Sequence, residues 1–182
     1  MKARKVKGLD PQRPLRENAA HIIATRIEEL RSFADAALEP SATVAQHDMR
    51  IAAKRLRYVL EVTGGCFGGD AKDARRAAKD LQTVLGEIHD CDVMLPRAIA
   101  HIEQLQAADA RAVLVRAEGA EDLEAKLVRE SPNRGSYRGL ELLAVHLKAR
   151  RALLFERFRD LWRSQARNGT WAALEQAAEK AG

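Results

Sequence analysis

The 182-residue sequence has few aromatic residues, few cysteines and no long apolar run, and each shortage excludes a class of protein. Phe, Trp and Tyr make up 4% of the chain, which leaves few platforms for stacking single-stranded bases. Cys66 and Cys91 are too few for a disulfide framework, so we expect reduced, structural thiols. No stretch approaches the roughly 20 apolar residues of a transmembrane helix. We therefore expect a cytoplasmic protein that does not contact a membrane.

Motifs of metal sites and of phosphate-transferring enzymes are also missing. His89 lies close to Cys91, but no second Cys/His pair completes a zinc site. The sequence contains no P-loop and no constellation of paired catalytic acids. We therefore expect no metal, no cofactor and no catalytic residue. An enzyme of phosphoanhydride chemistry, with a metal on His47, His89, Asp90 and Asp92, is the least favoured alternative.

The sequence also lacks segments that alternate with period two or are rich in β-branched residues, so we predict an all-α fold. Residues 1–14 form a basic arm that we expect to be flexible, and residues 15–182 form a single helical domain. Helices joined by short loops become neighbours, which predicts an antiparallel up-and-down bundle. The apolar spacing predicts helices over residues 15–38, 41–63, 70–88, 137–167 and 171–180, and a weaker helical stretch over 109–129 that is interrupted around Gly119. Residues 89–92 are predicted to form a short link, in which Asp90 or Asp92 caps a further helix that carries the apolar residues from Val93 to Leu105.

Positive charge is in excess, because the sequence has 31 Lys and Arg residues and 26 Asp and Glu residues. The sequence pI is about 9.5. Within the predicted helix 41–63, a turn of 100° per residue places His47, Arg50, Lys54 and Arg57 on one side, opposite an apolar stripe that includes Leu56. Arg presents forked donors that match phosphate oxygens, and Lys adds a mobile point charge. The pattern predicts an anion site, although one basic helix can also be a solvated face.

Cations on other predicted helices support the anion site. Arg26 falls within the apolar stripe of the first helix, where it must meet a carboxylate or point into a ligand-bearing groove. Basic residues also share one side of two later helices, and these are Lys72, Arg75, Arg76, Lys79, His146, Arg150 and Arg157. Cations that lean inward from separate helices favour a shared basic cleft.

Two motifs resemble those of the CHAD family, the conserved histidine α-helical domain. One is His47-x-x-Arg50-Ile51-x-x-Lys54-Arg55-Leu56-Arg57-Tyr58, and the other is Leu81-x-x-x-Leu85-Gly86-x-x-x-Asp90-x-Asp92-Val93. The resemblance implies a bundle of two pseudo-symmetric halves, whose basic residues surround a cleft or pore that binds inorganic polyphosphate without catalysis. The motif residues that carry this role are His47, Arg50, Lys54, Arg55 and Arg57.

The resemblance leaves several points open. The chain has no second clear H-x-x-R repeat, so a homodimer could be needed to complete a pore. A polyphosphate-binding protein could also be associated with polyphosphate granules in the cytoplasm. The main alternative function is nucleic-acid binding, which the high pI and the KRLR run at residues 54–57 allow.

Overall fold

The computed structural model describes residues 2–119 and 125–180. These residues form helices and no strand, which confirms the predicted all-α class. The helices are α1 (Leu15–Arg31), α2 (Ala34–Ala37), α3 (Thr43–Thr63), the 3₁₀ turn η1 (Gly64–Cys66), α4 (Gly68–Ala117), α5 (Ala125–Arg129), α6 (Arg134–Arg167) and α7 (Thr170–Glu179). The chain divides into two compact units. The first contains residues 1–89 and 153–182, and the second contains residues 90–152.

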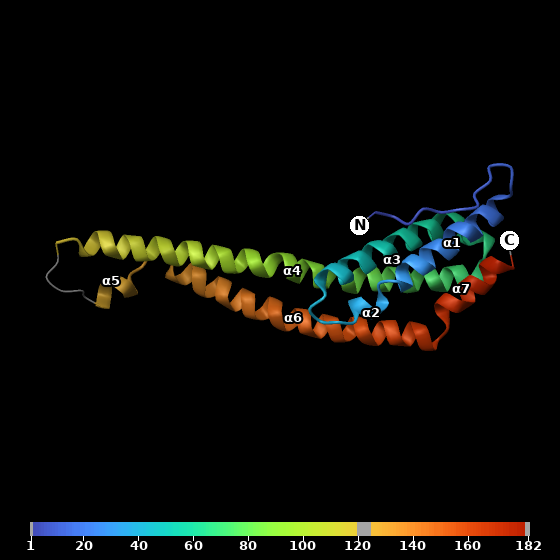
Figure 1. Ribbon diagram of the computed structural model, residues 1–182. Coiled ribbons are helices and arrows are strands. Elements are labelled where there is room, and N and C mark those ends of the chain that lie inside the picture. Colours follow the sequence, from blue (N-terminus) through green and yellow to red (C-terminus); the bar gives the residue numbers. More distant parts are fainter. Residues whose placement is uncertain (1, 120–124, 181–182) are drawn as a thin grey trace. The chain divides into compact units, whose positions relative to one another are not determined.

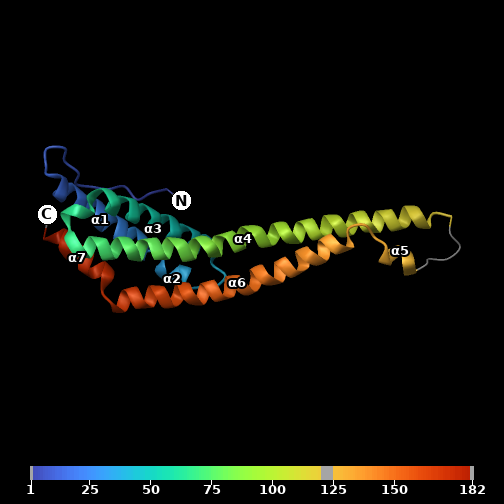
Figure 2. The ribbon, with the colours of Figure 1, turned by 180° about the vertical axis from the view of Figure 1, so that it is seen from behind.

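The first unit holds most of the apolar core. In this unit α1 packs against α3 and α7, and α2 packs against α3. The helices α1, α3 and the first part of α4 run in alternating directions, as predicted for an up-and-down bundle (Figure 1; Figure 2 gives the opposite view). The largest apolar side chains that are almost fully buried there are Ile23, Ile27, Leu30, Met49, Leu56, Leu81, Leu85, Ile88, Phe158 and Leu174.

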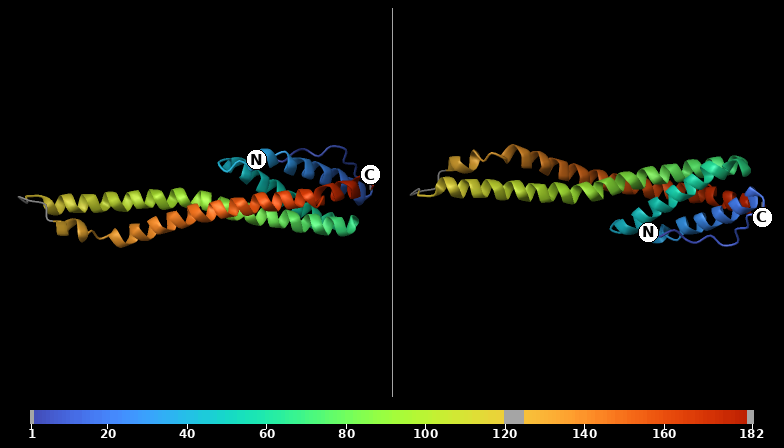
Figure 3. Two further views of the ribbon diagram at one scale, coloured as in Figure 1. Left: turned by 90° about the horizontal axis from the view of Figure 1, so that it is seen from below. Right: turned by 90° about the horizontal axis from the view of Figure 1, so that it is seen from above.

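The N-terminal arm, residues 2–14, lies along α1 (Figure 3). The Arg4 backbone N–H donates to Glu29 Oε1 at 3.2 Å, and the Arg4 guanidinium pairs with Glu28. Gly8 adopts a φ of 77° close to His21, and a Cβ at this position would lie 3.4 Å from the imidazole ring. These contacts tie the arm to the outside of the first unit.

The second unit, residues 90–152, is built from the later part of α4, the short α5 and the first part of α6. Arg151 on α6 pairs with Asp92 on α4. Between α5 and α6, Asn133 donates its backbone N–H and its side-chain amide to Asp109 Oδ1 on α4, at 3.1 and 2.9 Å. Among the described residues of this unit, only Cys91, Ala98 and Asp109 are buried.

The predicted break at residues 89–92 is wrong, because α4 is continuous from Gly68 to Ala117. Asp92 does not cap a helix there, since its carboxylate pairs with Arg151. Pro96 lies inside the helix, where it leaves the carbonyl four residues earlier without its usual N–H partner. The helix predicted over residues 15–38 is divided into α1, which ends at Arg31, and the short α2. Just after α1, the hydroxyl of Ser32 donates to the Glu29 carbonyl at 2.8 Å.

Candidate functional site

The cationic side of α3 lies against α4 in the first unit. At one end of this contact the His47 and His89 rings lie 4.6 Å apart, measured between centroids. At the other end Arg57 Nε donates to Gln82 Oε1 at 2.9 Å. Position numbers rise along α3 as they fall along α4, so the two helices meet as an antiparallel pair. We call this contact the α3–α4 seam.

Arg50 lies within this seam, next to Gly86. A Cβ added at Gly86 would lie 3.3 Å from Arg50 Nε, so the absence of a side chain lets the guanidinium approach the α4 backbone closely. Within the described part of the chain, neither Arg50 Nε nor His47 Nδ1 has a hydrogen-bond partner, although both atoms are buried. Buried polar atoms usually have a partner, so the Arg50 N–H marks the seam as a place for a hydrogen-bond acceptor, and His47 Nδ1 adds a second polar atom beside it.

The environment of His47 favours its neutral form. Burial lowers the pKa of its imidazole below 6.5, and the nearby positive charges of His89 and Arg50 lower it further. Asp48 acts in the opposite direction but is a weaker influence. An anion at the seam would reverse part of this effect, because negative charge stabilises the imidazolium.

Arg57 is held by three neighbours at once. Besides its bond to Gln82, Arg57 pairs with Glu61, one turn further along α3. Its guanidinium carbon also lies 4.4 Å from the centroid of the Tyr58 ring, and Lys54 Nζ lies 5.7 Å from the same ring. These contacts fix the position of the guanidinium at the edge of a cavity.

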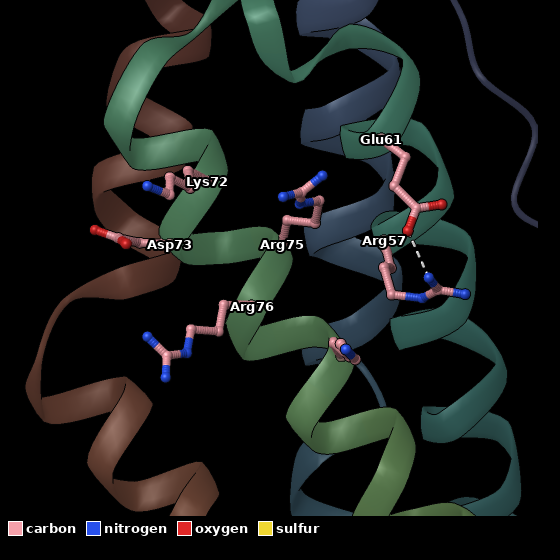
Figure 4. Close-up of a pocket in the computed structure, with 7 residues that line it drawn as sticks. Arg57, Glu61, Lys72, Asp73, Arg75 and Arg76 are labelled. Atoms are coloured by element: carbon pink, nitrogen blue, oxygen red, sulfur yellow. Dashed lines mark hydrogen bonds and ion pairs between the residues drawn. The ribbon is translucent and has the colours of Figure 1, made fainter.

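We call this cavity, which has a volume of about 440 Å³, the basic cavity. Five cationic and two acidic side chains line it, and these are Arg57, Lys72, Arg75, Arg76, Lys79, Glu61 and Asp73. In Figure 4 Arg57 and Glu61 project from α3, and the labelled side chains of Lys72, Asp73, Arg75 and Arg76 project from α4. The four cations of α4 are exposed, so they can meet a ligand without moving out of a core.

Arg26 and Arg55 have a different environment, which we call the Glu29 cluster. The Glu29 side chain is 1% exposed and pairs with Arg26 on the same helix and with Arg55 on α3, the latter at 2.8 Å. Arg26 Nη2 also donates to the Arg4 carbonyl oxygen at 2.8 Å. Arg26, which falls within the apolar stripe of α1, therefore pairs with a carboxylate. This is the first of the two environments that the sequence predicts for it.

The remaining predicted residues lie elsewhere. Arg157 on α6 lines a separate cavity of about 710 Å³ in the first unit, together with Asp80, Thr83, Asp160, Leu161 and Ser164. His146 and Arg150 are exposed residues of the second unit. Of the predicted set, the structure thus brings together Arg57 with four cations of α4, and His47 with Arg50.

From the sequence, no acidic or neutral residue other than a histidine is predicted to belong to the anion site, although Gly86 falls within a motif and His89 is a possible metal ligand. Nothing in the sequence pattern distinguishes Glu29 and Glu61 from the many other acidic residues of the predicted helices. Gln82, Gly86 and His89 do form a recognisable pattern, because their spacing of four and three places them on one side of α4. A glycine within an otherwise regular helical pattern is the clearest sign that another group approaches the backbone.

Neither a metal centre nor a membrane span was found in the described residues. No group of three or more His, Cys, Asp or Glu side chains in residues 2–119 and 125–180 could hold a metal ion. Over the same ranges, every helix is too short or too polar to cross a bilayer. Burial raises the pKa of the Cys91 thiol, and neither cysteine is in a disulfide.

Comparison with known protein families gives a match to the first part of the chain. The family model of the CHAD domain matches residues 2–99, which include the N-terminal arm, the α3–α4 seam and the basic cavity. No curated protein and no solved structure matches the chain. Because the matched segment covers more than half of the sequence and contains both motifs, the chain belongs to the CHAD domain family.

Proposed function

We propose that this protein binds inorganic polyphosphate through the basic cavity and the adjoining α3–α4 seam, and that it does not hydrolyse the polymer. The observation that carries this proposal is the composition of the cavity, in which five cations from two helices outnumber two carboxylates. Membership of the CHAD family supports the same ligand. Arg50 adds a buried N–H donor, and His47 a buried ring nitrogen, neither of which has a partner within the described residues.

The spacing of the cations suits a linear polyanion. Lys72, Arg75 and Lys79 follow one another at intervals of three and four residues on α4, which is about one helical turn of 5.4 Å. A flexible chain with a negative charge on every unit can contact all of them at once. Charge-assisted hydrogen bonds and the release of counterions then provide affinity, which should fall steeply as salt is added.

Arg26 and Arg55 are left out of the proposed ligand contacts. Both pair with Glu29, and Arg26 is only 8% exposed. Breaking a buried pair to bind a ligand would leave an uncompensated buried charge, which is costly. We therefore assign these two residues to holding α1, α3 and the N-terminal arm together.

Nucleic acid remains the alternative polyanion, and a competition experiment separates the two. Tyr58, which could stack a base, instead lies against Arg57 and Lys54. We expect polyphosphate to displace a labelled single-stranded DNA at equal phosphate concentration. If polyphosphate fails to displace the DNA, or does not bind, the proposal is wrong.

The absence of catalysis is tested separately. The protein is incubated with long-chain polyphosphate and Mg²⁺ or Mn²⁺, and the released orthophosphate is measured over time. We expect no release above the rate without protein. Rapid release would contradict the non-catalytic part of the proposal and leave the binding part intact.

A further inference from the structure

The two carboxylates of the basic cavity differ in what they contact. Glu61 pairs with Arg57, whereas Asp73 forms no ion pair within the described part of the chain. The Glu61 side chain is 39% exposed and that of Arg57 is 18% exposed. We propose that Glu61 is an internal competitor of polyphosphate, which occupies Arg57 in the free protein and leaves it when a phosphate group binds there. This inference rests on the proposed function.

Arg57 is placed so that its partner can change while its own position does not. Gln82 accepts a hydrogen bond from its Nε, and its guanidinium carbon lies over the Tyr58 ring, 4.4 Å from the centroid. Glu61 contacts only Nη1, from a partly exposed position one helical turn away. When Glu61 turns toward solvent, the guanidinium remains fixed at the cavity edge and can donate to a phosphate oxygen in its place.

A polymer can displace Glu61 more easily than a single small anion can. Glu61 is tethered to the same helix as Arg57, which gives it a high effective concentration at the guanidinium. A polyphosphate chain that already contacts Lys72 and Arg75 gains the same advantage, because its next phosphate is tethered too. A free orthophosphate ion has no such tether. Glu61 therefore favours ligands that engage several cations of the cavity together.

The size of the effect follows from the exposure of the pair. Exposed ion pairs of this kind change an equilibrium by about two- to five-fold. Replacing Glu61 by Gln removes the competitor and also one negative charge from the cavity. Replacing Asp73 by Asn removes one negative charge from the same cavity without freeing a cation, so it is the matched control.

The test is a double-mutant cycle on the full chain, read by the dissociation constant for long-chain polyphosphate at one fixed salt concentration. Glu61→Gln and Asp73→Asn are each made in the natural sequence and in the Arg57→Gln background. In the natural sequence, we expect Glu61→Gln to tighten binding by about two- to five-fold more than Asp73→Asn. In the Arg57→Gln background the two substitutions should have equal effects, because the competitor no longer has a cation to occupy. Circular dichroism checks that each variant keeps its helicity.

Two results overturn the inference. One is an equal effect of Glu61→Gln and Asp73→Asn in the natural sequence, and the other is a gain from Glu61→Gln that persists in full without Arg57. Failure of the proposed function looks different, because the natural protein would then not bind polyphosphate, or would bind it equally well after Lys72 and Arg75 are both replaced by Gln. If those replacements weaken binding while Glu61→Gln merely equals Asp73→Asn, only the competitor role of Glu61 is wrong.

Discussion

The Glu29 cluster and the basic cavity use the same side chains in opposite ways. In the cluster, one carboxylate that is 1% exposed pairs with Arg26 and Arg55 and accepts the Arg4 N–H. In the cavity, five Lys and Arg side chains outnumber two carboxylates, and the four cations that α4 contributes are exposed. A buried cation must be paired to be tolerated, whereas solvent permits an excess of positive charge. The excess is what a polyanion can use, so pairing with a buried carboxylate distinguishes the structural cations Arg26 and Arg55 from the proposed binding cations of the cavity.

The largest expected effect on stability comes from breaking the Glu29 cluster. Glu29→Gln leaves two guanidinium groups without their buried carboxylate, and we expect it to lower the free energy of unfolding by about 3–5 kcal/mol. Urea unfolding followed by circular dichroism measures this loss. Glu28→Gln is the control, because Glu28 pairs with Arg4 on the surface, and we expect it to cost less than about 1 kcal/mol. Equal losses for the two variants would show that the cluster is not a distinct structural unit.

A core substitution on α3 should lower stability without weakening the binding of folded protein. Leu56 is fully buried, on the side of α3 opposite the cationic residues, and Leu56→Ala should cost about 2–5 kcal/mol. Val62→Ala on the same helix is the control, since Val62 is 80% exposed and its truncation should change stability by about 0.5 kcal/mol or less. Polyphosphate titration at a temperature where both variants are folded should give the affinity of the natural protein. A weaker affinity for Leu56→Ala would link the core to the cavity.

The comparison between cluster and cavity also shows what the sequence could reveal. Helix α3 and its two faces follow from 3.6-residue periodicity, and its bounds agree closely with the prediction. The same pattern marked Arg26 as unusual, because a cation within an apolar stripe needs a partner. Periodicity describes one helix at a time, however, and it could not identify Glu29 as that partner of both Arg26 and Arg55.

Local signals failed where tertiary contacts decided the outcome. The sequence pattern predicts a link at residues 89–92, because aspartates often cap helices and a proline follows at position 96. In the structure α4 continues through them, and Asp92 is the partner of Arg151. An ion pair between residues 59 positions apart leaves no trace in a local pattern. The grouping of Arg57 with four cations of α4 likewise depends on how α3 and α4 pack.

Removing cations from the cavity should affect binding and not folding. We expect Lys72→Gln combined with Arg75→Gln to weaken polyphosphate binding about ten-fold, and to reduce the slope of log affinity against log salt by about one for each phosphate group that is no longer neutralised. The free energy of unfolding should change by less than about 0.5 kcal/mol, because both side chains are exposed. Titrations at several salt concentrations measure affinity and slope together.

The matched control for that variant removes the same net charge from residues of the first unit that do not line the basic cavity. Arg163 and Arg167 are exposed on α6 and do not line the basic cavity. Replacing both by Gln should weaken binding much less than the cavity variant does, because long-range attraction between exposed charges is screened by salt. Equally weakened binding in the two double variants would mean that net charge, and not the cavity, determines affinity.

The smallest expected effect concerns His47. Its environment is intermediate between the buried Glu29 cluster and the exposed cations of the basic cavity, because it is half-buried and lies next to two positive groups. Burial, His89 and Arg50 lower its pKa below the ordinary 6.5, so the unfolded chain binds a proton more readily than the folded protein does. His47 should therefore not affect stability at pH values above 6.5 and should lower it as the pH falls through and below that value. Urea unfolding at about pH 7.5 and about pH 5.5 measures the difference. In His47→Gln the loss of stability between the two pH values should be smaller than in the natural protein, and an equal loss would place the acid sensitivity on other groups.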